Sequence, residues 1–139
     1  MKFKLMLAAG CFLAGVTATH AQVGGVKVQV PFEFEMANMT LPAGEYVVWS
    51  EHDQVLLRVA GGKTVAMTQA NRTMHDGGKS GQVVFNCYDK RCFLSKLWTP
   101  DAEQGRELLM SKTEKQLAKH GEPQLFALLG KAPERNLRK

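Results

Sequence analysis

Two cysteines, Cys87 and Cys92, are the residues whose type and spacing point most directly to chemistry. They lie in strand-like segments on either side of Asp89-Lys90, which is typical of a hairpin turn. A two-residue turn would oppose the cysteines at a pair whose Cα atoms lie about 4.5 Å apart, at the short end of what a disulfide tolerates. A four-residue loop, 88–91, would oppose the same pair less rigidly. The spacing predicts a Cys87–Cys92 disulfide that fixes hairpin register, because redox catalysis normally uses Cys-x-x-Cys.

Histidines and carboxylates are the next candidates for chemistry. His52, His75 and His120 lack the His-x₃-His or His-Glu-x-x-His spacing of a metal site, so we interpret them as residues of turns and of a helix end. Glu33 and Glu35 share the polar face of an alternating segment, which is typical of solvent-facing strand residues. The sequence has no Gly-x-Ser-x-Gly nucleophile motif. We therefore predict no catalytic residue, no metal site and no cofactor, and we expect that the protein is not an enzyme.

Aromatic residues offer a binding site of another kind. Trp49 and Trp98, together with Tyr46 and Tyr88, could form a platform on which sugar rings stack. The same residues lie in segments of strong strand character, where aromatic side chains are favoured for packing. Trp49 and Trp98 are thus candidate ligand-binding residues, with packing as the simpler explanation.

The N-terminal segment predicts export. Two lysines precede an apolar run over residues 5–16, and small residues end the segment. This pattern is typical of a secretory signal peptide over residues 1–21, cleaved after Ala21. A lipobox over residues 8–11, with Cys11 as the lipidated residue, is the alternative. No later stretch of the sequence has the ~18 apolar residues that a membrane span needs, so we expect a secreted or periplasmic product.

The remaining chain has the size of one domain. Its positive charge is mild and dispersed, since two of the lysines behind the net charge of +5 leave with the signal peptide, and this argues against a nucleic-acid partner. We assign residues 22–120 to a β-domain and residues 121–139 to a loosely ordered basic tail.

The pattern of apolar residues predicts an all-β fold. From Val26 to Met36 apolar and polar residues alternate strictly, and Pro31 makes this strand either an edge strand or one broken by a bend. Residues 41–44 predict a turn in which Gly44 takes a positive φ. Further strands are expected over residues 46–49, 55–59, 64–69, 83–88, 92–98 and 106–110. We expect a small antiparallel β-sandwich or barrel of about six to seven strands.

One short C-terminal helix completes the expected fold. Ser111-Lys-Thr-Glu114 is a capping box, in which the Ser oxygen accepts from the amide of Glu114 while the Glu side chain reaches back. The helix should run from Lys112 to about His120 and end at Gly121.

Several short motifs follow one another along the chain in an order that matches a known family pattern. They are Val30-Pro31-Phe32-x-Phe34, Leu41-Pro42-Ala43-Gly44-x-Tyr46, Val84-Phe85, Arg91-x-Phe93-Leu94 and Trp98. With this spacing the chain resembles a family of small, uncharacterised secreted proteins common in Acidobacteria, over most of residues 26–119. The resemblance implies an exported β-domain and supplies no reaction. Asp89 stands where the family commonly has glycine, and Cys87 and Cys92 replace other residues, so the cysteines are a local addition.

The sequence therefore favours an exported, non-enzymatic β-domain with a structural or binding role in the cell envelope or the extracellular space. The alternative is a carbohydrate-binding accessory module or a hydrolase-associated domain. Contact with the envelope or with a polysaccharide is the partner class that we expect.

Overall fold

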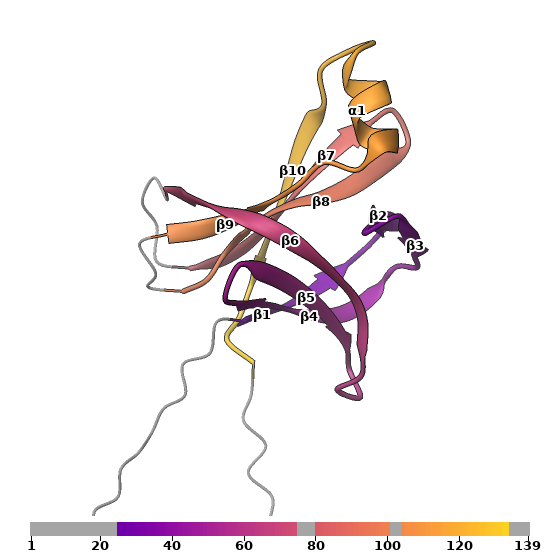
Figure 1. Ribbon diagram of the computed structural model, residues 1–139. Helices are drawn as coiled ribbons and strands as arrows, with labels where there is room; N and C mark the ends of the chain where they lie inside the picture. Colours follow the sequence, from indigo (N-terminus) through magenta and orange to yellow (C-terminus); the bar gives the residue numbers. More distant parts are fainter. Residues whose placement is uncertain (1–24, 75–79, 101–103, 134–139) are drawn as a thin grey trace, which may run out of the picture.

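The computed structural model describes residues 25–74, 80–100 and 104–133 (Figure 1). The predicted signal peptide, Cys11, His75 and the last six residues lie outside these ranges. The elements are β1 (Gly25–Val30), β2 (Phe34–Met36), β3 (Met39–Leu41), β4 (Gly44–Glu51), β5 (Gln54–Val59), β6 (Thr64–Met74), β7 (Gly81–Tyr88), β8 (Arg91–Trp98), β9 (Gln104–Leu108), α1 (Lys112–Ala118) and β10 (Gln124–Gly130).

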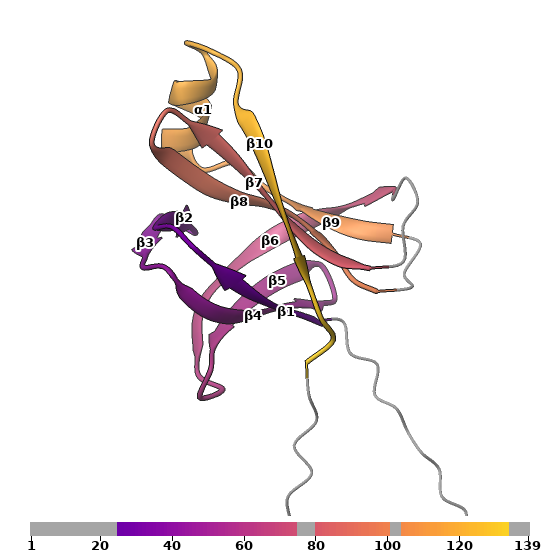
Figure 2. The same cartoon turned by 180° about the vertical axis from the view of Figure 1, so that it is seen from behind.

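One open sheet folds into two facing layers because the long strand β6 belongs to both. The first part of β6 pairs with β5 and its last part, residues 70–74, pairs with β9. The first layer has the order β1-β4-β5-β6, and the second continues through β9 to β8. β8 also pairs with β7, which carries β10, and in parallel with β2, which carries β3. Figures 1 and 2 show the two layers crossing, with β6 passing between them.

Apolar side chains from both layers meet in a single core. In β1 the residues at every second position are buried, as the strict alternation predicts. Edge-to-face aromatic contacts cross the core from Tyr46 to Phe34 and Phe85, and Phe32 continues this row to Phe126. The largest side chains that are almost completely buried are Phe34, Phe85, Leu57, Leu97, Val26, Val30, Val48, Val55 and Val83.

The all-β prediction is confirmed, whereas the expected six to seven strands are too few. Pro31 divides the alternating segment into β1 and β2, because it fixes its own φ and donates no hydrogen bond to a ladder. Residues 39–41, for which no strand was predicted, form β3. The sheet is mixed, since β2 and β8 are parallel. It is also open, because among the described residues the only backbone pairing at this edge is the isolated bridge between Lys27 of β1 and Lys131, which follows β10.

The prediction of a loosely ordered tail after residue 120 is wrong for residues 124–130. They form β10, which pairs with the whole length of β7 and so satisfies its backbone hydrogen bonds on one side. The positive φ expected at Gly44 is wrong as well, because the only glycine with a positive φ among the described residues is Gly62 in the β5–β6 turn. The helix ends at Ala118, with Lys119 as its C-cap, slightly before the predicted end.

The predicted disulfide is present. Cys87 and Cys92 face each other in the β7–β8 hairpin with their Cα atoms 3.9 Å apart. Tyr88 pairs with Arg91, so Asp89-Lys90 is the two-residue turn, and the alternative four-residue loop is not formed. No helix in the described part of the chain is long and apolar enough to cross a membrane.

Candidate functional site

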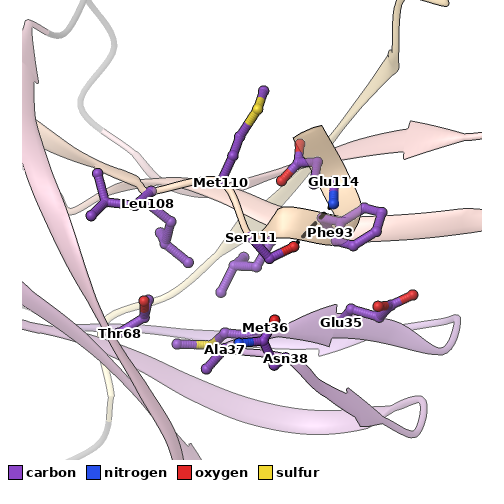
Figure 3. A pocket seen from close by; sticks show the side chains of 12 residues that line it. Glu35, Met36, Ala37, Asn38, Thr68, Phe93, Leu108, Met110, Ser111 and Glu114 are labelled. Carbon is purple, nitrogen blue, oxygen red and sulfur yellow. Dashed lines mark hydrogen bonds between the residues drawn. The ribbon is translucent and has the colours of Figure 1, made fainter. Parts of the chain in front are cut away.

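A pocket of about 180 Å³ lies between the layers, where the β2–β3 hairpin faces the segment that leads into α1 (Figure 3). It occupies a gap in the second layer. One edge of β8 pairs with β9 at Lys96 and Leu97 and with β2 only at Phe93, so Leu94 and Ser95 have no strand partner on that edge. Leu94 and Phe93 both line the pocket, which therefore opens between β9 and β2.

The pocket has an apolar floor and an apolar rim. Met36, Leu94 and Leu108 line it as buried side chains. Leu109 and Met110 also line it, but they are 52% and 41% exposed. Apolar side chains thus line the pocket both beside the core and beside solvent, and a ligand that covers Leu109 and Met110 would remove their apolar surface from water.

The tight turn of the β2–β3 hairpin forms the lower side of the pocket. Ala37 and Asn38 have φ values of 55° and 65°, as a two-residue hairpin turn with two left-handed positions requires. Asn tolerates this conformation, whereas Ala pays about 1 kcal/mol for it. Figure 3 shows Met36, Ala37 and Asn38 on one side of the gap and Ser111 and Glu114 on the other.

Glu35 lies at the edge of the pocket and has a charged partner. Arg91 donates from Nε to Oε2 at 2.8 Å and from Nη2 to Oε1 at 3.0 Å. This bidentate pair joins β2 to the first residue of β8 and fixes both side chains. The charge of Glu35 is therefore compensated within the protein.

Glu114 is the polar residue that distinguishes the site. It is only 4% exposed and lies in the first turn of α1, where its amide donates to Ser111 Oγ at 3.1 Å. This half of the predicted capping box is confirmed. The carboxylate does not reach back to Ser111; instead its Oε2 accepts from Asn86 Nδ2 at 3.1 Å and from the Tyr88 hydroxyl at 3.0 Å.

The environment of Glu114 affects Tyr88 in turn. Burial raises the pKa of Tyr88 to about 12, and the hydrogen bond to Glu114 and its negative charge add to the effect. Tyr88 therefore remains a protonated donor at physiological pH. Both donors to Glu114 are neutral, and within the described residues no Lys, Arg or His forms an ion pair with it.

The second oxygen of this carboxylate, Oε1, accepts no hydrogen bond from any described residue. It is not one of the buried polar atoms without a partner, so it is open to solvent. Glu114 lines the pocket together with Glu35, and no lysine, arginine or histidine lines it. A buried carboxylate without a counter-charge beside an apolar wall is chemically suited to a ligand that brings a positively charged donor and an apolar body.

Trp49 and Trp98 do not form a common platform. Trp49 lies in β4 of the first layer, with the Arg58 guanidinium 4.9 Å from its ring centre and Gly25 beside it. Trp98 ends β8 in the second layer and covers Gly105, where a Cβ atom would lie 2.1 Å from its ring. Both tryptophans are half-buried and packed against neighbouring strands.

The histidines that the structure describes lie apart from the pocket. His52 is in the β4–β5 turn with a φ of 57°, and His120 follows α1. Over residues 25–74, 80–100 and 104–133, no three His, Cys, Asp or Glu side chains come together as metal ligands.

Comparisons with known proteins add no identity to this geometry. No protein-family model, curated protein or solved structure matches the chain. Function must therefore be argued from the site.

Sequence reasoning missed the main residue of this site. The capping-box motif located Glu114 at the start of the helix, but it assigned the carboxylate to the wrong partner. The signal that could have found the site is the pair of exposed apolar residues Leu109 and Met110 directly before the cap, where a hydrophobic residue commonly packs inward.

Proposed function

We propose that the protein is an exported, non-enzymatic binding domain whose pocket holds an alkylammonium group, either as a small amine or as a side chain of a larger ligand in the envelope or the extracellular space. The N-terminal sequence and the disulfide support an oxidising compartment outside the cytoplasm. The observation that carries the proposal is the buried carboxylate of Glu114, which has one oxygen without a hydrogen-bond donor and no cationic partner among the described residues.

The charges of the lining residues support a cation over an anion. Glu114 gives the pocket a negative charge that no described residue compensates, whereas the charge of Glu35 is balanced by Arg91. An ammonium group beside Glu114 would form a charge-assisted hydrogen bond with Oε1, and an alkyl chain would cover Leu109 and Met110. The pocket volume of about 180 Å³ suits a group of the size of a lysine side chain.

The test compares three ligands of the same shape and different charge. Residues 22–139 are titrated with butylammonium, butanol and butyrate, and the amide NMR shifts around Leu109, Ser111 and Glu114 are followed. We expect saturable shifts with butylammonium alone. Butyrate binding as well as butylammonium, or no saturable shift with any of the three, would overturn the proposal.

Glu114→Gln is the matched variant. It keeps the shape and the acceptor for Asn86 and Tyr88 but removes the charge, so butylammonium affinity should fall at least about tenfold, the effect of about 1.4 kcal/mol. Asp89→Asn, which removes a charge from the exposed β7–β8 turn, should leave the affinity unchanged. Unchanged affinity of Glu114→Gln would show that this carboxylate does not recognise the ligand.

The same protein tests carbohydrate binding. Retention on a polysaccharide column that is lost in both Trp49→Ala and Trp98→Ala would favour a carbohydrate-binding module. We expect no such retention, because Arg58 covers a face of Trp49 and Trp98 covers Gly105.

A further inference from the structure

The last strand of the fold has an uncovered apolar edge. Of the strands that the structure describes, only β7 pairs with β10, and residues 124–130 contain no charged residue and no proline. Leu125 and Leu129 are 64% and 71% exposed, and Phe126 is exposed as well. Edge strands usually carry charges or proline that prevent pairing with another chain. Within β10 there is neither, and the nearest are Pro123 directly before it and Lys131 directly after it.

The bridge at the end of β10 shows which backbone groups face outward. Lys27 N–H donates to the Lys131 carbonyl at 2.7 Å, and Lys131 N–H donates to the Lys27 carbonyl at 3.0 Å. The N–H and C=O groups of alternate residues in a strand point to the same side. Those of Leu125, Ala127 and Leu129 therefore face the same open edge as those of Lys131.

β1 leaves this edge immediately after the bridge. A hollow of about 450 Å³ lies between the two strands, lined by residues that include Lys27, Gln29, Leu129 and Lys131. Figure 2 shows β1 and β10 diverging from their crossing point. Within the described residues, no strand pairs with the outward groups of Leu125, Ala127 and Leu129.

We propose that the open edge of β10 binds β10 of a second copy of this chain, antiparallel and related by a two-fold axis at Ala127. This register places Leu125 of each copy opposite Leu129 of the other, and all three residues with outward-facing groups form ladder hydrogen bonds. The exposed leucines then cover each other across the strands.

The charges at the ends of the strand favour a second copy over a foreign strand. Glu122 precedes β10 and Lys131 follows it, with no charge between them. Antiparallel pairing brings the acidic end of each strand to the basic end of the other, whereas parallel pairing would put like charges together. A two-fold contact of this kind closes on itself and leaves neither edge of the pair open.

Sedimentation equilibrium of residues 22–139 tests the association. We expect a reversible dimer for the wild type and a monomer for Leu129→Lys, because this change puts a charge opposite Leu125 of the other copy. Met67→Lys is the matched control, because Met67 is a 50% exposed apolar residue on β6, and it should remain dimeric. A wild type that is monomeric over the whole soluble concentration range would overturn the proposal.

A cross-link tests the register even if Leu129→Lys fails to fold. Two residues on the two-fold axis at a hydrogen-bonded pair have Cα atoms about 5.5 Å apart, which is the usual separation in a disulfide. Ala127→Cys should therefore oxidise to a covalent dimer in high yield, and Met67→Cys on β6 should not. Equal yields from the two variants would contradict pairing through β10.

Leu109→Lys separates this proposal from the function proposed for the pocket. It changes the rim of the pocket on the segment before α1, and it should weaken butylammonium binding while leaving the dimer intact. Leu129→Lys should do the reverse. Failure of one proposal therefore leaves the other open to its own test.

Discussion

The two strands beside the opening of the sheet, β1 and β10, have opposite designs. β1 buries every second side chain, and Lys27 on its other face pairs with Glu45 at 3.2 Å. Gln29 is exposed, and Pro31 follows the strand at once. β10 has apolar side chains on both faces and no charge within the strand, and its flanking proline, Pro123, precedes it.

This difference shows that the edges of β1 and β10 differ in polarity although the two strands lie side by side at the bridge. A strand with one polar face and a charged edge is stable beside water, whereas a charge-free apolar strand exposes surface that another chain can cover. The polarity of each edge, rather than its position in the sheet, therefore indicates where the protein associates.

The largest expected effect comes from breaking the point where the two strands cross. A Cβ atom on Gly130 would lie 2.4 Å from Val26 Cγ1 and 2.5 Å from the Lys27 carbonyl oxygen. Gly130→Ala should therefore separate β1 from β10 and lower the free energy of unfolding by about 3 kcal/mol, measured in urea. Gly121→Ala, which meets no atom within 4 Å, is the control. A loss below about 0.5 kcal/mol, the usual effect of a surface change, would show that the crossing is not tight.

The next largest effect concerns Tyr88, at the end of β7 where α1 packs. The pKa of Tyr88 rises from 10.0 to about 12, so the folded state holds its proton more tightly than the unfolded state. This contribution is complete below pH 10 and is lost as the pH rises from 10 to about 12. It amounts to less than about 3 kcal/mol. The free energies of unfolding of the wild type and of Tyr88→Phe should therefore approach each other by this contribution between pH 10 and about 12. If the two free energies instead change in parallel with pH, the prediction is wrong.

Loss of the disulfide on the β10 side of the opening should have a somewhat smaller effect on stability. The Cys87–Cys92 disulfide holds β7 in register, and Gln124 of β10 pairs with Cys87. Replacing both cysteines by serine should cost about 2 kcal/mol, because the closed loop is short. Hydrogen exchange should accelerate in β10 and stay unchanged in β1. Equal acceleration in both strands would mean that the disulfide supports the whole sheet.

The smallest effect concerns the charge that protects β1. Both partners of the Lys27–Glu45 pair are partly exposed, with side chains 36% and 39% accessible. Lys27→Ala should change the free energy of unfolding by less than about 0.5 kcal/mol, as exposed pairs usually do. A urea titration beside the wild type measures it. A decrease of more than about 1 kcal/mol in the free energy of unfolding would show that Lys27 stabilises the fold rather than only keeping other chains from pairing with β1.

Much of the fold follows from local sequence. Strict alternation located β1 and β2, Pro31 located the bend between them, and the spacing of Cys87 and Cys92 gave the hairpin with its disulfide. These features depend on neighbouring residues and on backbone geometry, which the sequence states directly.

The features that the sequence did not predict depend on distant partners. Residues 125–129 form an apolar run without alternation, so periodicity could not identify β10, which is a strand because β7 is available to pair with it. β3 is too short for a pattern. The partners of Glu114 on β7 lie 26 and 28 positions earlier in the chain, so the site exists only once α1 is packed on β7.

The bridge between Lys27 and Lys131 also sets the order of events in folding. Its two residues are separated by about one hundred positions, so the chain closes one of its longest loops to form it. A growing chain cannot make this contact until residue 131 has emerged, and contacts of such long range slow folding. The layers β4-β5-β6 and β7-β8 can form earlier from neighbouring segments. The last step of folding should therefore be the arrival of β10 at β1.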